Sequence, residues 1–175
     1  MKPVTTFLIL ILSLPLTAQS LRWGAELDAL PYLSGGYYGS VIAGYDQWQV
    51  RAVLTRTTLP DFATSDGIKS HRLDAVALIG DYFFDSTATG WWVGSGVEWW
   101  SNRLAPESGG TRSFEQWVLT LGGGYTWEFT SWLYVNPWAA LHLPVSGTSP
   151  VQVGSVRHEP QAVVVSGSVK VGFRF

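Results

Sequence analysis

The chain has 175 residues, and only 14% of them are charged, against about a quarter in an ordinary soluble domain. Its formal net charge of −2, with no basic stretch, argues against a nucleic-acid partner. The absence of cysteine excludes a disulfide-stapled domain and a lipid-anchored lipoprotein.

The first twenty residues, MKPVTTFLILILSLPLTAQS, predict a secretory signal peptide. Lys2 provides a basic start, an apolar run covers 7–16, and small residues precede a cleavage point after Ala18 or Ser20. Pro15 interrupts a run already too short to span about 30 Å of hydrocarbon. We therefore assign residues 1–20 to the signal peptide and 21–175 to one domain. For an exported, charge-poor and aromatic-rich chain with no long apolar run, the way to cross a membrane is to close its strands into a barrel.

Alternation with a period of two predicts eight strands, of which the first four lie in the N-terminal half. The first two span 22–32 and 37–45, the third begins at Trp48, and the fourth contains 72–79. Their apolar faces hold, in chain order, Trp23, Ala25, Leu27 and Ala29; Tyr37, Gly39, Val41, Ala43 and Tyr45; Trp48, Val50, Ala52 and Leu54; and Leu73, Ala75, Ala77 and Ile79. Their opposite faces hold Glu26 and Asp28; Ser40 and Ile42; Gln49, Arg51 and Thr55; and Arg72 and Asp74.

The last four strands contain 90–104, 116–128, 133–143 and 165–175. Their apolar faces hold Trp91, Val93, Val97 and Trp99; Trp117, Leu119, Leu121, Tyr125 and Trp127; Leu133, Val135, Ala139, Leu141 and Leu143; and Val165, Val169, Val171, Phe173 and Phe175. Their polar faces hold Glu98 and Asn102; Gln116, Thr120, Thr126 and Glu128; Asn136 and His142; and Lys170 and Arg174. Arg56 and Arg103 break the apolar faces only at strand ends, where a long side chain reaches the interface.

The connections alternate in length. Longer ones follow the odd strands, and tight turns follow the even strands, at Asp46-Gln47, near DSTAT and at Thr130-Ser131. This asymmetry predicts short periplasmic turns and longer extracellular loops, the longest of them at 146–161.

The large aromatic residues sort by strand end and by face at the same time. The predicted girdle residues are Trp23, Tyr45, Trp48, Trp91, Trp127 and Phe173 at the tight-turn ends, and Trp99 and Trp117 toward the long-loop ends. The ten residues from Trp117 to Trp127 cover roughly 33 Å of strand, or about 25 Å of height at a tilt of about 40°. That height matches the apolar band of an outer-membrane barrel.

The eight alternating segments, the loop asymmetry and the terminal VGFRF resemble the small eight-stranded outer-membrane barrels of the OmpA/OmpX type. The resemblance implies an all-β fold, an antiparallel up-and-down transmembrane β-barrel in a Gram-negative outer membrane. It also implies contact with outer-membrane lipids, lipopolysaccharide and the barrel-insertion machinery. In that family a terminal phenylalanine is the insertion signal, so the resemblance implies this role for Phe175.

The polar faces predict an interior charge network of four acids and four bases. Its members are Glu26, Asp28, Arg51, Arg72, Asp74, Glu98, Lys170 and Arg174. An eight-stranded barrel is only wide enough for its own side chains, and buried charges must be paired. We expect Glu26 or Asp28 to pair with Lys170 at closure, and inward Trp92, Trp100 and Trp138 to fill the remaining space. The sequence therefore predicts a side-chain-filled interior without open diffusion.

The sequence offers little support for catalysis or metal binding. Some small outer-membrane barrels modify lipid A with a histidine and a serine, and here His142 is followed by Ser146. Four residues along a strand are about 13 Å, too far for a nucleophile and its base. His71 is predicted to face lipid and His158 to lie in a loop, and three separated histidines give no metal-ligand spacing. We assign no catalytic residue, metal or cofactor.

The function predicted from the sequence is a non-enzymatic integral outer-membrane protein with a structural or surface-interaction role. Loop 146–161 is its candidate recognition surface, because rigid scaffolds commonly present binding loops. Two alternatives stay open. One is a lipid A-modifying outer-membrane enzyme, and the other is a secreted soluble β-barrel or sandwich that binds a ligand in an apolar interior.

Overall fold

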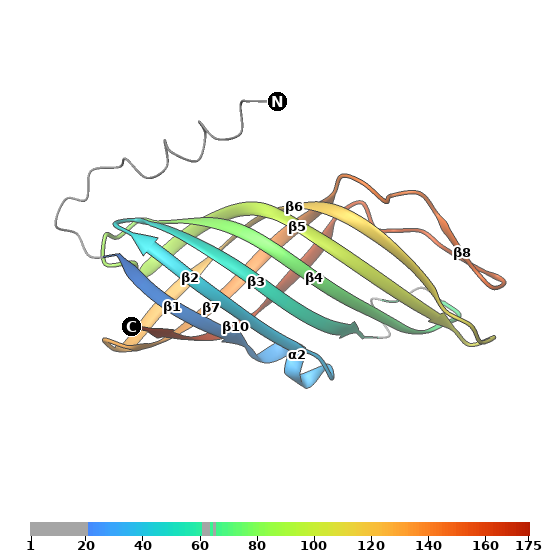
Figure 1. The fold of residues 1–175 in the computed structure, drawn as a ribbon, viewed down its shortest axis with the longest axis horizontal. Coiled ribbons are helices and arrows are strands. Elements are labelled where there is room, and N and C mark those ends of the chain that lie inside the picture. Colours follow the sequence, from blue (N-terminus) through green and yellow to red (C-terminus); the bar gives the residue numbers. More distant parts are fainter. Residues whose placement is uncertain (1–20, 61–63, 65) are drawn as a thin grey trace, which may run out of the picture.

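A computed structural model describes residues 21–60, 64 and 66–175, and the predicted signal peptide lies outside these ranges. Eight antiparallel strands close into a barrel in the order β1-β10-β7-β6-β5-β4-β3-β2 (Figure 1). The barrel strands are β1 (Arg22–Asp28), β2 (Tyr37–Tyr45), β3 (Trp48–Leu59), β4 (Ile68–Phe83), β5 (Gly90–Pro106), β6 (Arg112–Thr130), β7 (Leu133–Pro144) and β10 (Val164–Arg174). The predicted fold class is confirmed.

The two ends of the barrel differ in their connections. At the end that carries the C-terminus, strands β2 and β3 join through Asp46 and Gln47, and residues 84–89 and 131–132 make the other two turns (Figure 1). The opposite end carries the longer connections, including residues 145–163. We call these the turn end and the loop end.

Two elements at the loop end differ from the prediction. The first strand ends at Asp28 rather than continuing to residue 32, because Asp28 caps the short helix α2 (Ala29–Leu33) by accepting from the Leu30 N–H at 3.1 Å. The longest loop contains a hairpin of β8 (Val151–Val153) and β9 (Val156–His158), which the sequence analysis missed. Among the described residues, no helix has the length and apolar character needed to cross a membrane.

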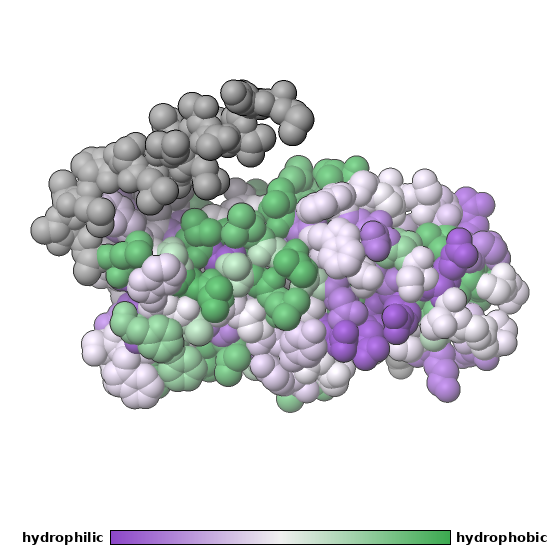
Figure 2. All heavy atoms as spheres, viewed as in Figure 1, coloured by the Kyte–Doolittle hydropathy of each residue, from purple (hydrophilic) through white to green (hydrophobic). Residues whose placement is uncertain are grey.

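The outward face of the barrel is apolar. Trp48, Trp91 and Trp127 are 62%, 66% and 64% exposed, and Figure 2 shows hydrophobic residues gathered over the turn end and the middle. The predicted girdle residues lie on this face, and most of them are exposed. Those of the turn end are near strand ends, whereas Trp99 and Trp117 lie farther inside β5 and β6. Phe173 is partly covered because the Trp132 ring stacks on it, with ring centroids 6.2 Å apart.

The faces of β4 are the reverse of the prediction. Ala75, Ala77 and Ile79 are buried inside, whereas Val76 and Leu78 are exposed outside. The stretch AVALI (75–79) is apolar on both faces, so alternation carried no signal there, and the charges that precede it were wrongly assigned to the interior. Arg72 and Asp74 share the outward parity of Val76, and Asp74 pairs with Arg56 of β3. His71 was predicted to face lipid, but it points inward and is buried.

Candidate functional site

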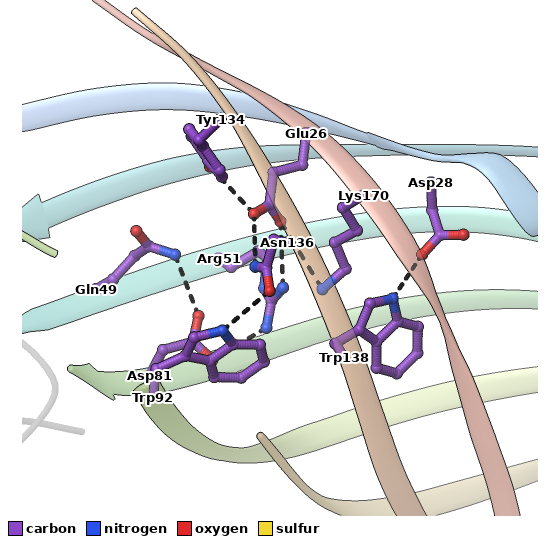
Figure 3. A network of polar contacts seen from close by, with 10 residues as sticks. All are labelled: Glu26, Asp28, Gln49, Arg51, Asp81, Trp92, Tyr134, Asn136, Trp138 and Lys170. Atoms are coloured by element: carbon purple, nitrogen blue, oxygen red, sulfur yellow. Dashed lines mark hydrogen bonds and ion pairs between the residues drawn. The ribbon is translucent and has the colours of Figure 1, made fainter. Parts of the chain in front are cut away.

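The half of the interior nearer the turn end is occupied by four buried charges, which we call the inner cluster: Glu26, Arg51, Asp81 and Lys170. The Arg51 guanidinium lies 3.1 Å from a Glu26 oxygen and 3.0 Å from an Asp81 oxygen (Figure 3). Lys170 Nζ lies 3.8 Å from the same Glu26 oxygen, across the β1–β10 closure. The expected contact between Glu26 and Lys170 is therefore present.

Neutral side chains donate further hydrogen bonds to the carboxylates of the inner cluster. The second oxygen of Glu26 accepts from the Tyr134 hydroxyl at 3.0 Å and from the Asn136 amide at 3.2 Å. Gln49 donates to Asp81 at 3.2 Å. A buried charge is costly unless its remaining lone pairs are satisfied, and these donors reduce that cost.

Aromatic rings surround the cationic groups of the inner cluster. Lys170 Nζ lies 4.5 Å from the ring centroid of Trp138 and 5.6 Å from that of Trp92. The Arg51 guanidinium lies 5.2 Å from the Trp92 ring, and Trp138 donates its indole N–H to Asp28 at 2.7 Å (Figure 3). The rings and the cationic side chains therefore fill this half of the barrel, and cation–π attraction and van der Waals contact hold them together.

The other predicted members of the charge network lie elsewhere. Arg174 pairs with Glu128 near the turn end, Glu98 lies in the outer half, and Arg72 and Asp74 are outside the barrel. Asp81 was missed because the fourth strand was ended at residue 79. Its inward position follows from its shared parity with Ala75 and Ala77.

The half of the interior nearer the loop end contains a cavity of about 600 Å³, which we call the outer chamber. Its walls are mainly small or apolar: Val53, Ala75, Ala77, Ile79, Ala140 and Val164. Arg51, Trp92 and Lys170 form its floor, and residues of α2 and of the loops, such as Leu30 and Pro160, border its mouth. The prediction of a filled interior is wrong for this half, because the alanines expected to face lipid point inward.

One polar chain crosses the chamber wall from a backbone carbonyl to His71. Gln116 donates to the Gly147 carbonyl at 3.2 Å, and Asn102 donates to the Gln116 side-chain oxygen at 3.0 Å. A carbonyl only accepts, so this order leaves the Asn102 oxygen as acceptor for the His71 Nε2–H at 2.8 Å. His71 Nδ1 is then a buried acceptor, and no described group donates to it.

A second polar chain joins four adjacent strands, β5, β6, β7 and β10. Ser166 Oγ lies 2.6 Å from His142 Nε2, and His142 Nδ1 lies 3.1 Å from Glu98 Oε1. Thr120 bonds to Glu98 and lies 2.9 Å from His142 Nδ1. Sequence reasoning missed this arrangement because His142 and Ser166 are 24 residues apart and meet only through the register of β7 and β10.

The hairpin β8–β9 packs on the loop end of β4 and β5. Val153 lies in one buried apolar cluster with Ile68 and Leu104. The His158 ring lies edge-on to His71, with centroids 5.5 Å apart, and 5.7 Å from the Phe114 ring. Burial, followed by the nearby His71, lowers the pKa of His158 below its ordinary value. Within the described ranges, no three acidic, histidine or cysteine side chains are grouped to hold a metal ion.

The sequence matches no known protein-family model and no curated protein. Solved structures that are similar in fold include two bacterial proteins of low sequence identity. The N-terminal β-barrel domain of Pseudomonas aeruginosa OprF is 14% identical with a TM-score of 0.55, over 89% of this chain and 96% of that one. Acinetobacter baumannii CarO is 14% identical with a TM-score of 0.53, over 88% and 97% of the two chains. At this identity the likeness concerns the fold alone.

Proposed function

We propose that this chain, which has the fold of the small eight-stranded outer-membrane β-barrels, is a non-conducting outer-membrane protein that binds a small ligand. The observation that carries the proposal is the outer chamber, which is floored by the inner cluster and bordered by the loops. A ligand would therefore enter from the outer surface and stop at the charges. Binding of this kind needs no chemistry from the chain.

The distribution of apolar surface supports a membrane location. Exposed tryptophans, leucines and valines cover the outward face (Figure 2), an extent of apolar surface that soluble monomers rarely show. The soluble alternative needs a polar exterior, which is the reverse of this arrangement. We propose that this face contacts outer-membrane lipids and lipopolysaccharide, and that Phe175 serves the insertion machinery.

The inner cluster supports a non-conducting barrel. Three carboxylates and two cations, counting Asp28 with the four cluster residues, share this half of the interior with the rings of Trp92 and Trp138. An ion passing through would have to displace paired charges whose partners are already in place. We expect no stable unitary conductance from the purified barrel in a planar bilayer.

The chamber walls indicate the chemistry of the ligand. Its volume lies within the ordinary range of small-molecule sites, and its small apolar side chains favour a hydrocarbon or aromatic body. The bare acceptor at His71 Nδ1 favours a ligand with one hydrogen-bond donor, such as a hydroxyl or an amide N–H. Glu159, Pro160 and Gln161 border the mouth, so the predicted recognition loop contributes through its C-terminal end.

A matched pair of variants tests this binding role. Val53 faces the chamber and Leu54, its neighbour, is exposed on the outward face, so Val53→Trp fills the chamber and Leu54→Trp does not. With N-octylbenzamide as probe, native mass spectrometry should show a 1:1 adduct of the wild type and L54W that V53W lacks. Equal binding by V53W and L54W would place the ligand elsewhere and overturn the proposal.

The hydrogen bond to His71 is tested separately. N-methylation of the probe removes its donor and should weaken binding to the wild type by roughly 3- to 10-fold, the value of one ordinary hydrogen bond. The variant His71→Phe should bind both probes equally. A methylation penalty that persists in H71F would remove His71 from the site while leaving the chamber intact.

A further inference from the structure

The polar chain that ends at Ser166 has a defined direction of hydrogen bonding. Glu98 accepts from the Trp100 indole N–H at 2.6 Å and from the Thr120 hydroxyl. An ionised carboxylate only accepts, so the proton between His142 and Glu98 belongs to His142 Nδ1. In the neutral imidazole, His142 Nε2 is then unprotonated and accepts from the Ser166 hydroxyl. The serine, the base and the orienting carboxylate therefore stand in the order that activates a nucleophile.

The position of this chain suits a reaction on a molecule in the outer chamber. Ser166, His142 and Glu98 all line the chamber. Ser166 follows the first residue of β10 by two positions, near the loop end, and Lys170 lies four residues deeper, about 13 Å along the strand. Ser166 is half-buried and lines the chamber, so it is not enclosed in packed side chains.

We propose that Ser166 is the nucleophile of an ester-hydrolysing site in the outer chamber, with His142 as general base and Glu98 as positioning residue. Ser166 Oγ forms a bond to the ester carbonyl carbon while its proton passes to His142 Nε2. The carbon–alkoxide bond then breaks, and the departing alcohol takes that proton. Water attacks the acyl-serine, gives a proton to His142 Nε2, and the carboxylic acid leaves as Ser166 is reprotonated.

The surroundings select a neutral ester with an apolar acyl group. The chamber walls are mainly small apolar side chains, which favour an apolar acyl group. Arg51 and Lys170, the cations of the floor, are already paired with Glu26 and Asp81 of the inner cluster, so a carboxylate ligand would have to compete with these partners. This inference rests on the proposed binding role and goes beyond it, because it adds a reaction.

The barrel backbone sets an upper limit on the rate. Around Ser166, strand β10 pairs with β7 without interruption, whereas its pairing with β1 stops at Lys170. The N–H groups that point toward β7 are engaged in this ladder and do not serve as oxyanion donors. Loss of a single oxyanion donor slows serine proteases by about 100- to 1,000-fold, so we expect slow turnover here.

Covalent labelling provides the test. The full barrel, refolded in detergent, is treated with a fluorophosphonate, which transfers its phosphonyl group to an activated serine with loss of fluoride. We expect one adduct, located by peptide mass spectrometry at Ser166 in the wild type and absent in Ser166→Ala. His142→Gln should slow labelling and hydrolysis of 4-nitrophenyl octanoate by about 100-fold or more, the usual contribution of a general base.

Two further variants separate catalysis from a structural role of the chain. Ser146→Ala is the matched control, since Ser146 accepts from the Trp117 N–H outside the chamber, and it should label like the wild type. Glu98→Gln should shift the pH profile of hydrolysis as well as its rate, because it alters the proton held by His142. All variants must first show the heat-dependent gel migration of a closed barrel.

The outcomes are distinguishable from those of the binding role. If S166A binds N-octylbenzamide but the wild type is not labelled at Ser166, the chamber binds ligands without chemistry and this inference is overturned. Equal ester hydrolysis by S166A and the wild type overturns it as well. If neither probe binds and no label forms, the binding role fails with it.

Discussion

The inner and outer halves of the barrel interior are lined by the same strands but are built differently. Strand β4 supplies Asp81 to the inner half and Ala75 and Ala77 to the outer half. Strand β10 supplies Lys170 to the inner half and Ser166 to the outer half. Alternation decides which residues point inward, but the volume of those residues decides whether the space between them is filled.

Because the two halves are built differently, we expect the inner half to determine stability and the outer half to determine ligand binding. In the inner half, large rings and paired charges leave no room for a ligand, and each group depends on several partners. In the outer half, small side chains leave room, and the polar groups form two chains along the wall. Substitutions in the inner half should therefore act on unfolding, and those in the outer half on binding.

The largest expected effect is loss of the acid at the centre of the inner cluster. Glu26→Ala leaves Arg51 and Lys170 buried without this partner, and breaking a buried pair costs about 3–5 kcal/mol. Urea unfolding in lipid vesicles, followed by tryptophan fluorescence, measures the change. Asp74→Ala is the control, because its pair with Arg56 is more than one-third exposed on both sides and should contribute little. Equal losses in E26A and D74A would contradict the assigned roles of the two halves.

A smaller effect is expected where Trp92 closes the inner half against β6. In Gly124→Ala the new Cβ would meet the Pro137 carbonyl and would lie 2.9 Å from Trp92 Cζ2. Overpacking of this kind costs about 1–3 kcal/mol. The matched control is Gly39→Ala, where nothing lies within 4 Å of the new Cβ, so the free energy of unfolding should hardly change. Similar values for the two variants would mean that Trp92 moves freely and does not seal the barrel.

The barrel itself followed from the sequence because seven of the eight strands carry a clear difference between faces. The β2 bounds are those predicted, and the eighth strand is displaced by one residue. The faces of strand β4 were predicted wrongly because both faces are apolar, so alternation did not distinguish them. Had the strand been extended to Phe83, Asp81 would have shared parity with Ala75, a signal that the alanines face inward.

The candidate site was less accessible to sequence reasoning than the fold. Charged residues marked the inner cluster, since an acid and a base on strands that must close together are expected to pair. The outer chamber has no such marker, because a cavity results from small side chains on several strands and these form no recognisable sequence motif. His142 was noticed, but its partner was sought four residues away along the chain instead of across the ladder on β10. Contacts of this kind depend on strand register, which alternation alone does not fix.

The smallest expected effect concerns the mouth of the outer chamber and depends on pH. Burial and the neighbouring His71 lower the pKa of His158 in the packed hairpin, whereas the pKa in an undocked hairpin is about 6.5. The undocked state therefore binds more protons as the pH falls through about 6.5, and docking weakens below that value while it is complete above it. After correction for intrinsic rates, hydrogen exchange at residues 151–158 should be faster at pH 5.5 than at pH 7.5.

The control for this effect is His158→Phe, which keeps a ring against Phe114 and removes the titrating group. Its corrected exchange should be the same at both pH values. If the pH dependence persists in H158F, the titration belongs to His71, the other imidazole in the contact, and His71→Phe should then abolish it. In either case the loosened hairpin lies beside His71, which lines the chamber. Release of N-octylbenzamide from the wild type should therefore be faster at pH 5.5 than at pH 7.5. Undocking of the hairpin should not change the free energy of unfolding, because the inner cluster sets that free energy.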